Sequence, residues 1–365
     1  MNCISELNEI LKQHFIWNKA RLDCFTRMLL ALFVARTVNL RELAVAMNSS
    51  AMVSSRYMRL KRFFWEHRFN YDLIAKLIFN WFFQGKKIYI TIDRTNWYLG
   101  KSKINVLMLA VAYEGVAIPL FWCLLNKAGN ATAGEHRAIL ARFIRVFGTD
   151  CIAGVLGDRE FASGKLFNYL NKHNIPFYIR IKDNSQAYIK RKKFCKVKAI
   201  FSHLHLKEKT EFQMSVWLYD QKVFLAGSRS ERGELMVIAT NQLPATAVAI
   251  YLRRWEIETL FSCLKSRGFR FEDTRITKRD RLKKLIALLA VGFCWAHKTG
   301  EWRAKKKPIR LCQHRTGGIR PQHSYFRYGL DFIRDIVINP TKKLTKFRQC
   351  LALLLPNQPP MEVMP

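Results

Sequence analysis

Acidic residues are scarce in this sequence. Its 365 residues contain 27 Asp and Glu against 62 Lys and Arg, which gives a formal net charge of +35 at pH 7. The excess runs through the whole chain, and such a field attracts polyanions, of which nucleic acid is the commonest. A ribosomal-type or membrane-surface basic protein is the alternative. Because half of the residues are hydrophobic and 13% are aromatic, the composition excludes a disordered basic tail and predicts two or three folded domains.

Paired cysteines are also missing. The nine cysteines are odd in number, scattered, and never spaced as Cys-x-x-Cys. The sequence therefore indicates reduced thiols rather than a disulfide framework. A zinc site formed by Cys312, His314 and His323 would match no standard ligand spacing.

Long apolar runs are missing as well. The longest extends only from Leu285 to Ala296, which is short of the ~20 residues that span a bilayer. The first ten residues contain Glu6 and Glu9 and lack the apolar stretch of a signal peptide. We therefore expect a soluble, intracellular protein.

Residues 1–83 have helical periodicity. Leu40 to Met47 is followed by the turn signal Asn48-Ser-Ser-Ala and then by Met52 to His67, which carries several Arg and Lys among aromatic residues. A helix, a short polar turn and a basic helix are typical of a DNA-reading unit. The alternative is a helical bundle with a solvated basic face.

From Lys86 the periodicity changes to that of an α/β domain. The pattern predicts three strands, a helix, a strand, a helix and a strand: Ile88–Asp93, Val106–Tyr113, Ala117–Leu125, Glu135–Phe147, Cys151–Leu156, Ser163–His173 and Pro176–Ile181. This order resembles the ribonuclease-H-like fold, in which the first and fourth strands lie side by side. Asp93, late on the first strand, and Asp158, just past the fourth, would then converge. The alternative for a strand-end aspartate is a turn or cap residue.

The remaining chain completes a five-part division. We expect residues 1–83 to form a helical DNA-end-binding domain and residues 84–183 to form the first part of the ribonuclease-H-like core. Residues 184–233 read as a β-strand-rich insertion. Residues 234–300 hold the second part of the core, with a long helix that begins at Pro244. Residues 301–365 are a basic helical C-terminal region, with a helix from Tyr325 to Val337, loop composition at 317–323 and a Pro-rich tail from Pro356.

Four polar residues interrupt the apolar helix of residues 247–268. Tyr251, Arg254, Glu258 and Lys265 follow one another at steps of three, four and seven residues, which places them on one helical face. A carboxylate flanked by two cations and a phenol suits the binding of phosphate and a divalent metal. The alternative is an amphipathic helix with incidental charges. Glu256 should point away from this face and pair with Arg253 or with a neighbouring basic segment.

The three carboxylates Asp93, Asp158 and Glu258 can together bind two Mg²⁺ ions about 3.5–4 Å apart, with Mn²⁺ as a substitute. Such a centre would activate water or a 3′-hydroxyl and stabilise the leaving oxygen of a phosphodiester. Glu160 is a less favoured alternative to Asp158 as the second ligand, because it lies two residues beyond the strand end.

These residues resemble the DDE transposases of bacterial insertion sequences, and specifically the insertion-sequence-four family with its Y-x2-R-x3-E-x6-K signature. Tyr251, Arg254, Glu258 and Lys265 fit that spacing, and Asp93 and Asp158 lie in Thr-Ile-Asp-Arg-Thr-Asn-Trp and Gly-Asp-Arg-Glu-Phe boxes. The resemblance covers about residues 85–300. It implies that Asp93, Asp158 and Glu258 bind metal, while Tyr251, Arg254 and Lys265 contact phosphates near the transposon end.

The expected function is that of a DNA transposase. It would bind the terminal inverted repeats of its element and, with Mg²⁺, cleave the DNA and transfer strands to target DNA. The resemblance also implies a DNA-bound dimer in the cytoplasm of a bacterium, associated with the nucleoid. It further implies a hairpin intermediate whose flipped base would stack on Trp97, Trp217 or Trp255. The alternatives are a catalytically unused DNA-binding protein and a ribonuclease-H-like nuclease.

Overall fold

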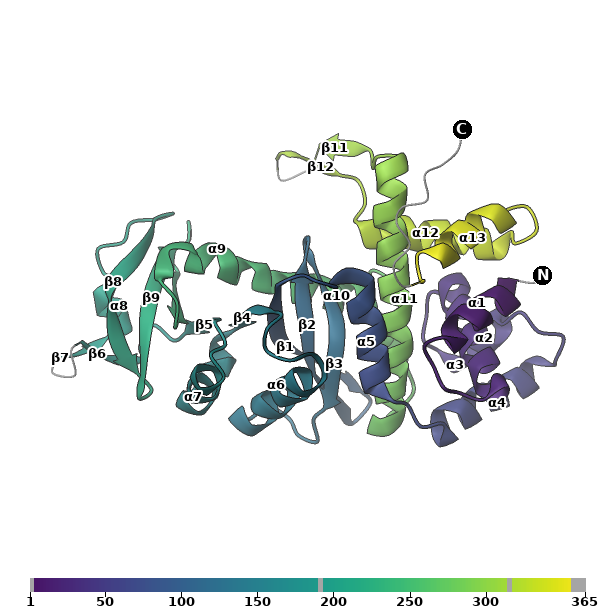
Figure 1. The fold of residues 1–365 in the computed structure, drawn as a ribbon, viewed down its shortest axis with the longest axis horizontal. Coiled ribbons are helices and arrows are strands. Elements are labelled where there is room, and N and C mark those ends of the chain that lie inside the picture. The colour runs from purple at the N-terminus through teal and green to yellow at the C-terminus, as the bar shows by residue number, and fades with distance from the viewer. Residues whose placement is uncertain (1–2, 190–192, 314–316, 356–365) are drawn as a thin grey trace. The chain divides into compact units, whose positions relative to one another are not determined.

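The computed structural model describes residues 3–189, 193–313 and 317–355. The chain is of mixed α/β class and divides into two compact units (Figure 1). The helical unit comprises Met1–Phe82, Leu99–Ser102 and Phe261–Pro365. The sheet unit comprises Phe83–Tyr98 and Lys103–Leu260.

The helical unit begins with the helices that the sequence predicts. They are α1 (Cys3–Lys12), α2 (Lys19–Ala35), α3 (Leu40–Ala46), α4 (Val53–Glu66) and α5 (Tyr71–Phe82). The side chains of Asn18 and Asn39 accept hydrogen bonds from the first-turn backbone of α2 and α3, as N-cap residues do. The basic helix α4 is tied to α2, because Arg59 donates to Asp23 over 3.0 Å.

The second half of the helical unit is built around α11 (Arg279–Lys306), whose stretch from Leu285 to Ala296 is buried. It packs against α12 (Tyr325–Ile338) through two glycines. A Cβ added at Gly300 or Gly329 would lie 1.8 Å from a backbone oxygen of the facing helix, so only glycine permits this approach. Helix α13 (Leu344–Ala352) follows.

Two features of this half bear on the sequence predictions. The loop composition of residues 317–323 conceals a short strand, β12 (Ile319–Pro321), which pairs with β11 (Leu311–Gln313). The prediction of a loop there is wrong, because a three-residue strand is too short to show periodicity. The tail from Pro356 lies outside the described residues. None of the described helices is both long and apolar enough to cross a membrane.

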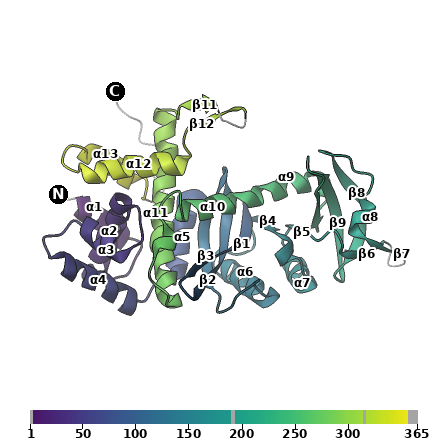
Figure 2. The ribbon, with the colours of Figure 1, turned by 180° about the vertical axis from the view of Figure 1, so that it is seen from behind.

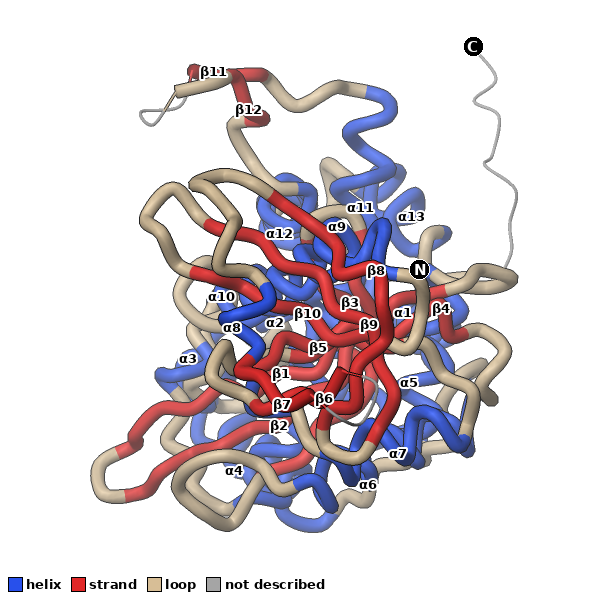
Figure 3. The backbone as a smooth tube through the Cα atoms, turned by 90° about the vertical axis from the view of Figure 1, so that its left-hand side faces the viewer, coloured by secondary structure: helices blue, strands red, loops and turns tan. Residues whose placement is uncertain are grey.

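The sheet unit contains one large mixed sheet (Figure 3), with the strand order β3-β2-β1-β4-β5-β10-β9-β8-β6-β7 across its described residues. The strands are β1 (Ile88–Leu99), β2 (Ser102–Tyr113), β3 (Val116–Leu124), β4 (Ile152–Gly157), β5 (Phe177–Ile181), β6 (Gln186–Ile189), β7 (Lys193–Lys196), β8 (Lys209–Leu218), β9 (Gln221–Arg229) and β10 (Leu235–Thr240). Helices α6 (Ala133–Phe147) and α7 (Gly164–Lys172) follow β3 and β4, and the short α8 (Val197–Ile200) lies in the insertion.

The centre of the sheet brings the two aspartates to one place. Strand β1 pairs with β4 in parallel, in a register that sets Ile92 beside Gly157, so Asp93 and Asp158 follow neighbouring positions. The predicted adjacency of the first and fourth strands is confirmed. Asp93 is not late on its strand, however, because β1 continues to Leu99 and forms a long hairpin with β2. Residues 93–95 are half-buried, and Trp97 is buried farther along the strand.

The helix predicted from Pro244 is broken. A 3₁₀ turn (Pro244–Thr246) leads into α9 (Ala247–Leu252), a second 3₁₀ turn (Arg253–Trp255) follows, and α10 runs from Glu256 to Leu264. Helix α9 lies against β5, β9 and β10 (Figure 2). The prediction of one continuous helix is wrong at Arg253–Trp255, where the side chains of Arg253 and Arg254 reach acceptors on the sheet rather than following a regular helical face.

Candidate active site

Asp93 is held on β1 between a backbone donor and a cation. The N–H of Arg94 donates to its Oδ1 over 2.6 Å, and Arg254 Nη1 lies 3.3 Å from its Oδ2. Burial raises the pKa of Asp93 to about 6. The Arg94 N–H and Arg254 oppose this rise, and the neighbouring Glu160 and Glu258 charges add to it.

Arg254 joins two of the predicted carboxylates. Arg254 is buried, with 4% of its surface exposed. Its Nη1 contacts Asp93, and its Nη2 donates to Glu258 Oε1 over 3.0 Å. Burial alone would lower the pKa of Arg254, but the surrounding anionic groups raise it. The guanidinium therefore remains charged and neutralises a pair of carboxylates that would otherwise repel each other.

Tyr251 connects α9 to the second aspartate. Its hydroxyl donates to Asp158 Oδ1 over 3.5 Å, and burial raises its pKa to about 12. The phenol therefore stays protonated and acts as a hydrogen-bond donor. Asp158 precedes the 3₁₀ turn Arg159–Phe161 without a side-chain cap bond. Its side chain thus faces Tyr251 instead of serving the turn.

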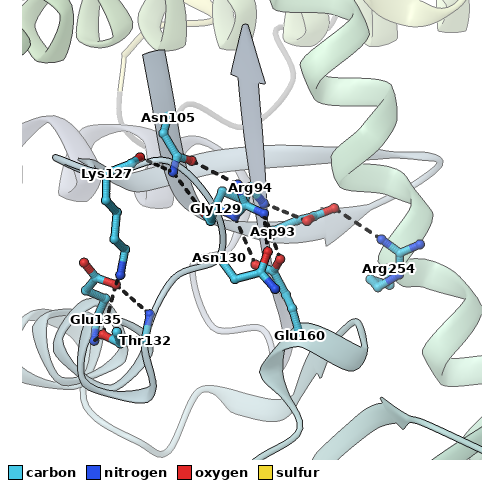
Figure 4. Close-up of polar contacts among 10 residues, drawn as sticks. All are labelled: Asp93, Arg94, Asn105, Lys127, Gly129, Asn130, Thr132, Glu135, Glu160 and Arg254. Carbon is cyan, nitrogen blue, oxygen red and sulfur yellow. Dashed lines mark hydrogen bonds and ion pairs between the residues drawn. The ribbon is translucent and has the colours of Figure 1, made fainter. Parts of the chain in front are cut away.

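A second network supports the same region and was missed by sequence reasoning (Figure 4). The Arg94 guanidinium donates two hydrogen bonds, 3.1 and 3.3 Å long, to the Glu160 carboxylate. It also donates to the side-chain oxygens of Asn105 and Asn130. Asn105 in turn donates to the backbone oxygens of Lys127 and Gly129. The signal available in the sequence was the position of Arg94 directly after Asp93 and of Glu160 two residues after Asp158.

The same network ties the helix α6 to the loop that precedes it. Thr132 and Glu135 form a capping box at the start of α6, and Lys127 pairs with Glu135 over 2.6 Å. Because Asn105 holds the Lys127–Gly129 backbone, the loop, the helix start and Arg94 form one connected support. Glu160 belongs to this support, because it accepts hydrogen bonds from Arg94.

Two further polar residues of the predicted helix, Lys265 and Glu256, each form an ion pair. Lys265 follows the end of α10 in the helical unit and pairs with Glu272 over 2.9 Å. Glu256 pairs with Arg253 over 3.4 Å, as the sequence predicts. The contacts described above place Tyr251, Arg254 and Glu258 in one site with Asp93 and Asp158.

The donor set suits a hard divalent cation, because carboxylate oxygens are the ligands that Mg²⁺ prefers. Two of the three carboxylates already converge on a single positive group, the Arg254 guanidinium. Across residues 3–189, 193–313 and 317–355, no three His, Cys, Asp or Glu side chains lie close enough together to hold a metal ion. His314 of the possible zinc site lies outside the described residues.

The three tryptophans proposed for base stacking differ in exposure. Trp97 is buried at 8% exposed, Trp217 on β8 is half-buried, and Trp255 is 54% exposed. The guanidinium carbon of Arg254 lies 4.9 Å from the centre of the Trp255 ring. Of the three, Trp255 alone combines an open ring with contact to the site.

The chain was compared with protein families, with solved structures and with curated proteins. A family model described as a transposase DDE domain matches residues 84–295. A cryo-EM structure of the piggyBac transposase synaptic complex with hairpin DNA aligns with a TM-score of 0.49 and 12% identity, over 98% of this chain and 83% of that chain. The search of curated proteins gave no match.

Proposed function

The chain belongs to the family of transposases with a DDE domain, enzymes that cleave and transfer DNA, and on that premise we propose which residues act. Asp93, Asp158 and Glu258 are the acidic triad, and they would hold two Mg²⁺ ions once the three side chains, which do not form a metal-sized cluster in this structure, are drawn together. When bound, the metal supplies a nucleophile at neutral pH and charge stabilisation for an in-line displacement. The observation that carries this assignment is the Arg254 bridge between Asp93 and Glu258, with Tyr251 on Asp158.

The finer assignment is to the insertion-sequence-four family, with the terminal inverted repeats of its element as substrate. Tyr251, Arg254 and Lys265 then hold phosphates of the transposon end. Arg254 suits a bidentate phosphate contact and Lys265 a point charge. On DNA binding, Arg254 would exchange one carboxylate partner for a phosphate.

The remaining parts of the chain take roles around this centre. The order β3-β2-β1-β4-β5 supports a ribonuclease-H-like core with an insertion between β5 and β10. The helices of residues 1–83 bind the repeat, with the α3–turn–α4 segment as the reading element, and residues 301–365 form a basic C-terminal region. Joining two DNA ends to target DNA requires a DNA-bound dimer.

A hairpin route for second-strand cleavage is favoured by one observation. The Trp255 ring is open to solvent and stacks near Arg254, where a base flipped from the transposon end could lie on it. Replacement of Trp255 by Ala should then reduce hairpin formation while leaving the first nick intact, as seen on denaturing gels of the cleavage products.

The central test uses two glutamates on the same helix. Glu258→Gln should lower cleavage of a duplex carrying the repeat that flanks the gene by about 100-fold or more, because it removes a charge that stabilises the metal centre. Glu256→Gln makes the same chemical change two residues away and should leave cleavage within about threefold. Asp93→Ala and Asp158→Ala should behave like Glu258→Gln.

Binding separates loss of chemistry from loss of folding. Each variant should bind the repeat duplex in the absence of divalent metal nearly as tightly as the parent protein, measured by fluorescence anisotropy. Cleavage that survives in the Glu258 variant would refute the assignment of the triad.

A further inference from the structure

A large basic pocket opens in the sheet unit beside the acidic cluster. It has a cavity volume of about 840 Å³ and lies where β5 and the loop after it meet α8, β9 and the 3₁₀ turn that follows Asp158. We call it the basic pocket, because its lining includes five cationic residues: Arg159, Arg180, Lys182, Lys198 and Arg229. None of the roles proposed above uses them.

Positive charge dominates the pocket. Against the five cations stand two carboxylates, Asp183 and Glu234, and Glu234 is engaged by Arg180 over 2.5 Å. Arg159, Lys182 and Lys198 are exposed. These cations therefore face solvent, where a polyanion can reach them.

The walls of the pocket are fixed by hydrogen bonds. Arg229 Nη1 donates to the Gly233 backbone oxygen over 3.2 Å, and the Lys198 N–H donates to the Asp183 backbone oxygen over 2.8 Å. Together with the Arg180–Glu234 pair, these bonds hold β9, the loop before β10 and the start of α8 in place. The pocket is thus preformed, and binding there requires little ordering.

The pocket adjoins the acidic site directly. Arg159 follows Asp158 in the chain, and Arg180 directly follows Ile179, which pairs with Gly157 at the end of β4. Tyr251 contacts Asp158. A strand that leaves the acidic site past Asp158 can therefore reach Arg159 and Arg180, which line the pocket together with Lys182 and Lys198.

We propose that the basic pocket binds the phosphate backbone of the DNA that continues past the cleavage point, outside the transposon end. The cations come from several separate segments, which suits a run of phosphates better than a single phosphate group. Among the residues that the structure describes, those lining the pocket include no aromatic ring. The contacts would therefore position the strand without stacking on its bases. This inference rests on the proposed function, because it takes the acidic cluster as the cleavage point.

The test compares a pocket variant with a matched control. Lys182→Gln/Lys198→Gln removes two exposed charges from the pocket, and Lys165→Gln/Lys172→Gln removes two exposed charges from α7 in the same unit. Two duplexes serve as probes: one ends at the cleavage point, and the other carries about one helical turn, ~10 base pairs, of flanking DNA. Binding is measured by fluorescence anisotropy without divalent metal, from about 50 to 200 mM salt.

On the flanked duplex, the pocket variant should bind about tenfold more weakly than the parent. The slope of the logarithm of its binding constant against the logarithm of salt concentration should be shallower by about two, since each lost phosphate contact removes about 0.9. On the duplex that ends at the cleavage point, it should match the parent. The α7 control should match the parent on both duplexes. Equal behaviour of the pocket variant and the α7 control on the flanked duplex would overturn the proposal, as would an equal deficit on both duplexes.

The readouts separate the two proposals. Binding is measured without metal, so the comparison of the two duplexes tests the pocket proposal even if the parent protein does not cleave. Failure of the parent to cleave would count against the acidic triad alone. Cleavage by the parent with no pocket-dependent binding would count against the pocket alone.

Discussion

The acidic site and the basic pocket meet at the peptide between Asp158 and Arg159, yet they handle charge in opposite ways. In the acidic site, Arg254 is buried and contacts both Asp93 and Glu258. In the basic pocket, the cations include exposed lysines.

The difference teaches what each region can do. Charges that are withdrawn from water interact strongly and are little screened by salt, but they carry a desolvation cost. Charges that stay in water contribute little to stability and are screened within about 10 Å at 0.1 M salt. The acidic site should therefore govern chemistry and stability, and the basic pocket should govern affinity and its salt dependence.

The largest expected effect follows removal of the buried bridge. Arg254→Ala removes the cation that bridges Asp93 and Glu258, and should lower the free energy of unfolding by about 2–3 kcal/mol, below the ~3–5 kcal/mol of a fully buried pair because Glu258 is partly exposed. Urea unfolding at pH 8 without divalent metal measures this loss. Added Mg²⁺ should recover more stability in this variant than in the parent, because it neutralises the same carboxylates.

The adjacent arginine provides the control. Arg253 is more exposed, pairs with Glu256 and donates to the Ala112 backbone oxygen. Arg253→Ala should therefore cost about 1 kcal/mol or less. If the two alanine variants lose equal stability, the distinction between a buried bridge and an ordinary surface cation fails.

A smaller effect, of opposite sign, is expected at Asp93. Its pKa is raised from 3.8 to about 6 in the folded protein, so the folded state binds this proton more tightly than the unfolded state. Its contribution to stability therefore falls as the pH rises from about 4 through about 6. Asp93→Asn removes the charge and should stabilise the metal-free protein by about 1–2 kcal/mol at pH 8, less than the full shift implies because the contact with Arg254 is weakened.

The pH dependence is the sharper part of this prediction. The gain from Asp93→Asn should shrink steadily as the pH is lowered from 6 toward 4, in urea unfolding series at constant ionic strength. Asp150→Asn, at an exposed position, should show no such trend. A gain at Asp93 that is independent of pH would mean that burial of its charge is not the cause.

The arrangement of the two aspartates could be predicted from the sequence because it depends on local patterns. The order of strands and helices predicts that β1 and β4 are neighbours, and the register of Ile92 with Gly157 then follows from the sheet. Steps of three and four residues likewise predicted that Tyr251, Arg254 and Glu258 share a face. The 3₁₀ turn at Arg253–Trp255 could not be predicted in this way.

That failure has a physical cause. The break in the helix coincides with contacts from Arg253 to Ala112 and from Arg254 to Asp93, which are remote in sequence, and no periodicity within the helix reports on them. The basic pocket shows the same limit. Its cations are spread from Arg159 to Arg229, so they form no motif, and only the folding of the insertion against β5 gathers them.

The smallest expected effect concerns the stability of the pocket itself. Lys182→Gln and Lys198→Gln should each change the free energy of unfolding by less than about 0.5 kcal/mol, since both side chains are exposed. Arg180→Gln, which breaks the pair with Glu234, should cost about 1 kcal/mol and so lie between the lysines and Arg254. Urea unfolding of all three variants gives the ranking. A large loss from either lysine would show that the pocket, like the acidic site, is held together by its charges, and the contrast between the two regions would then disappear.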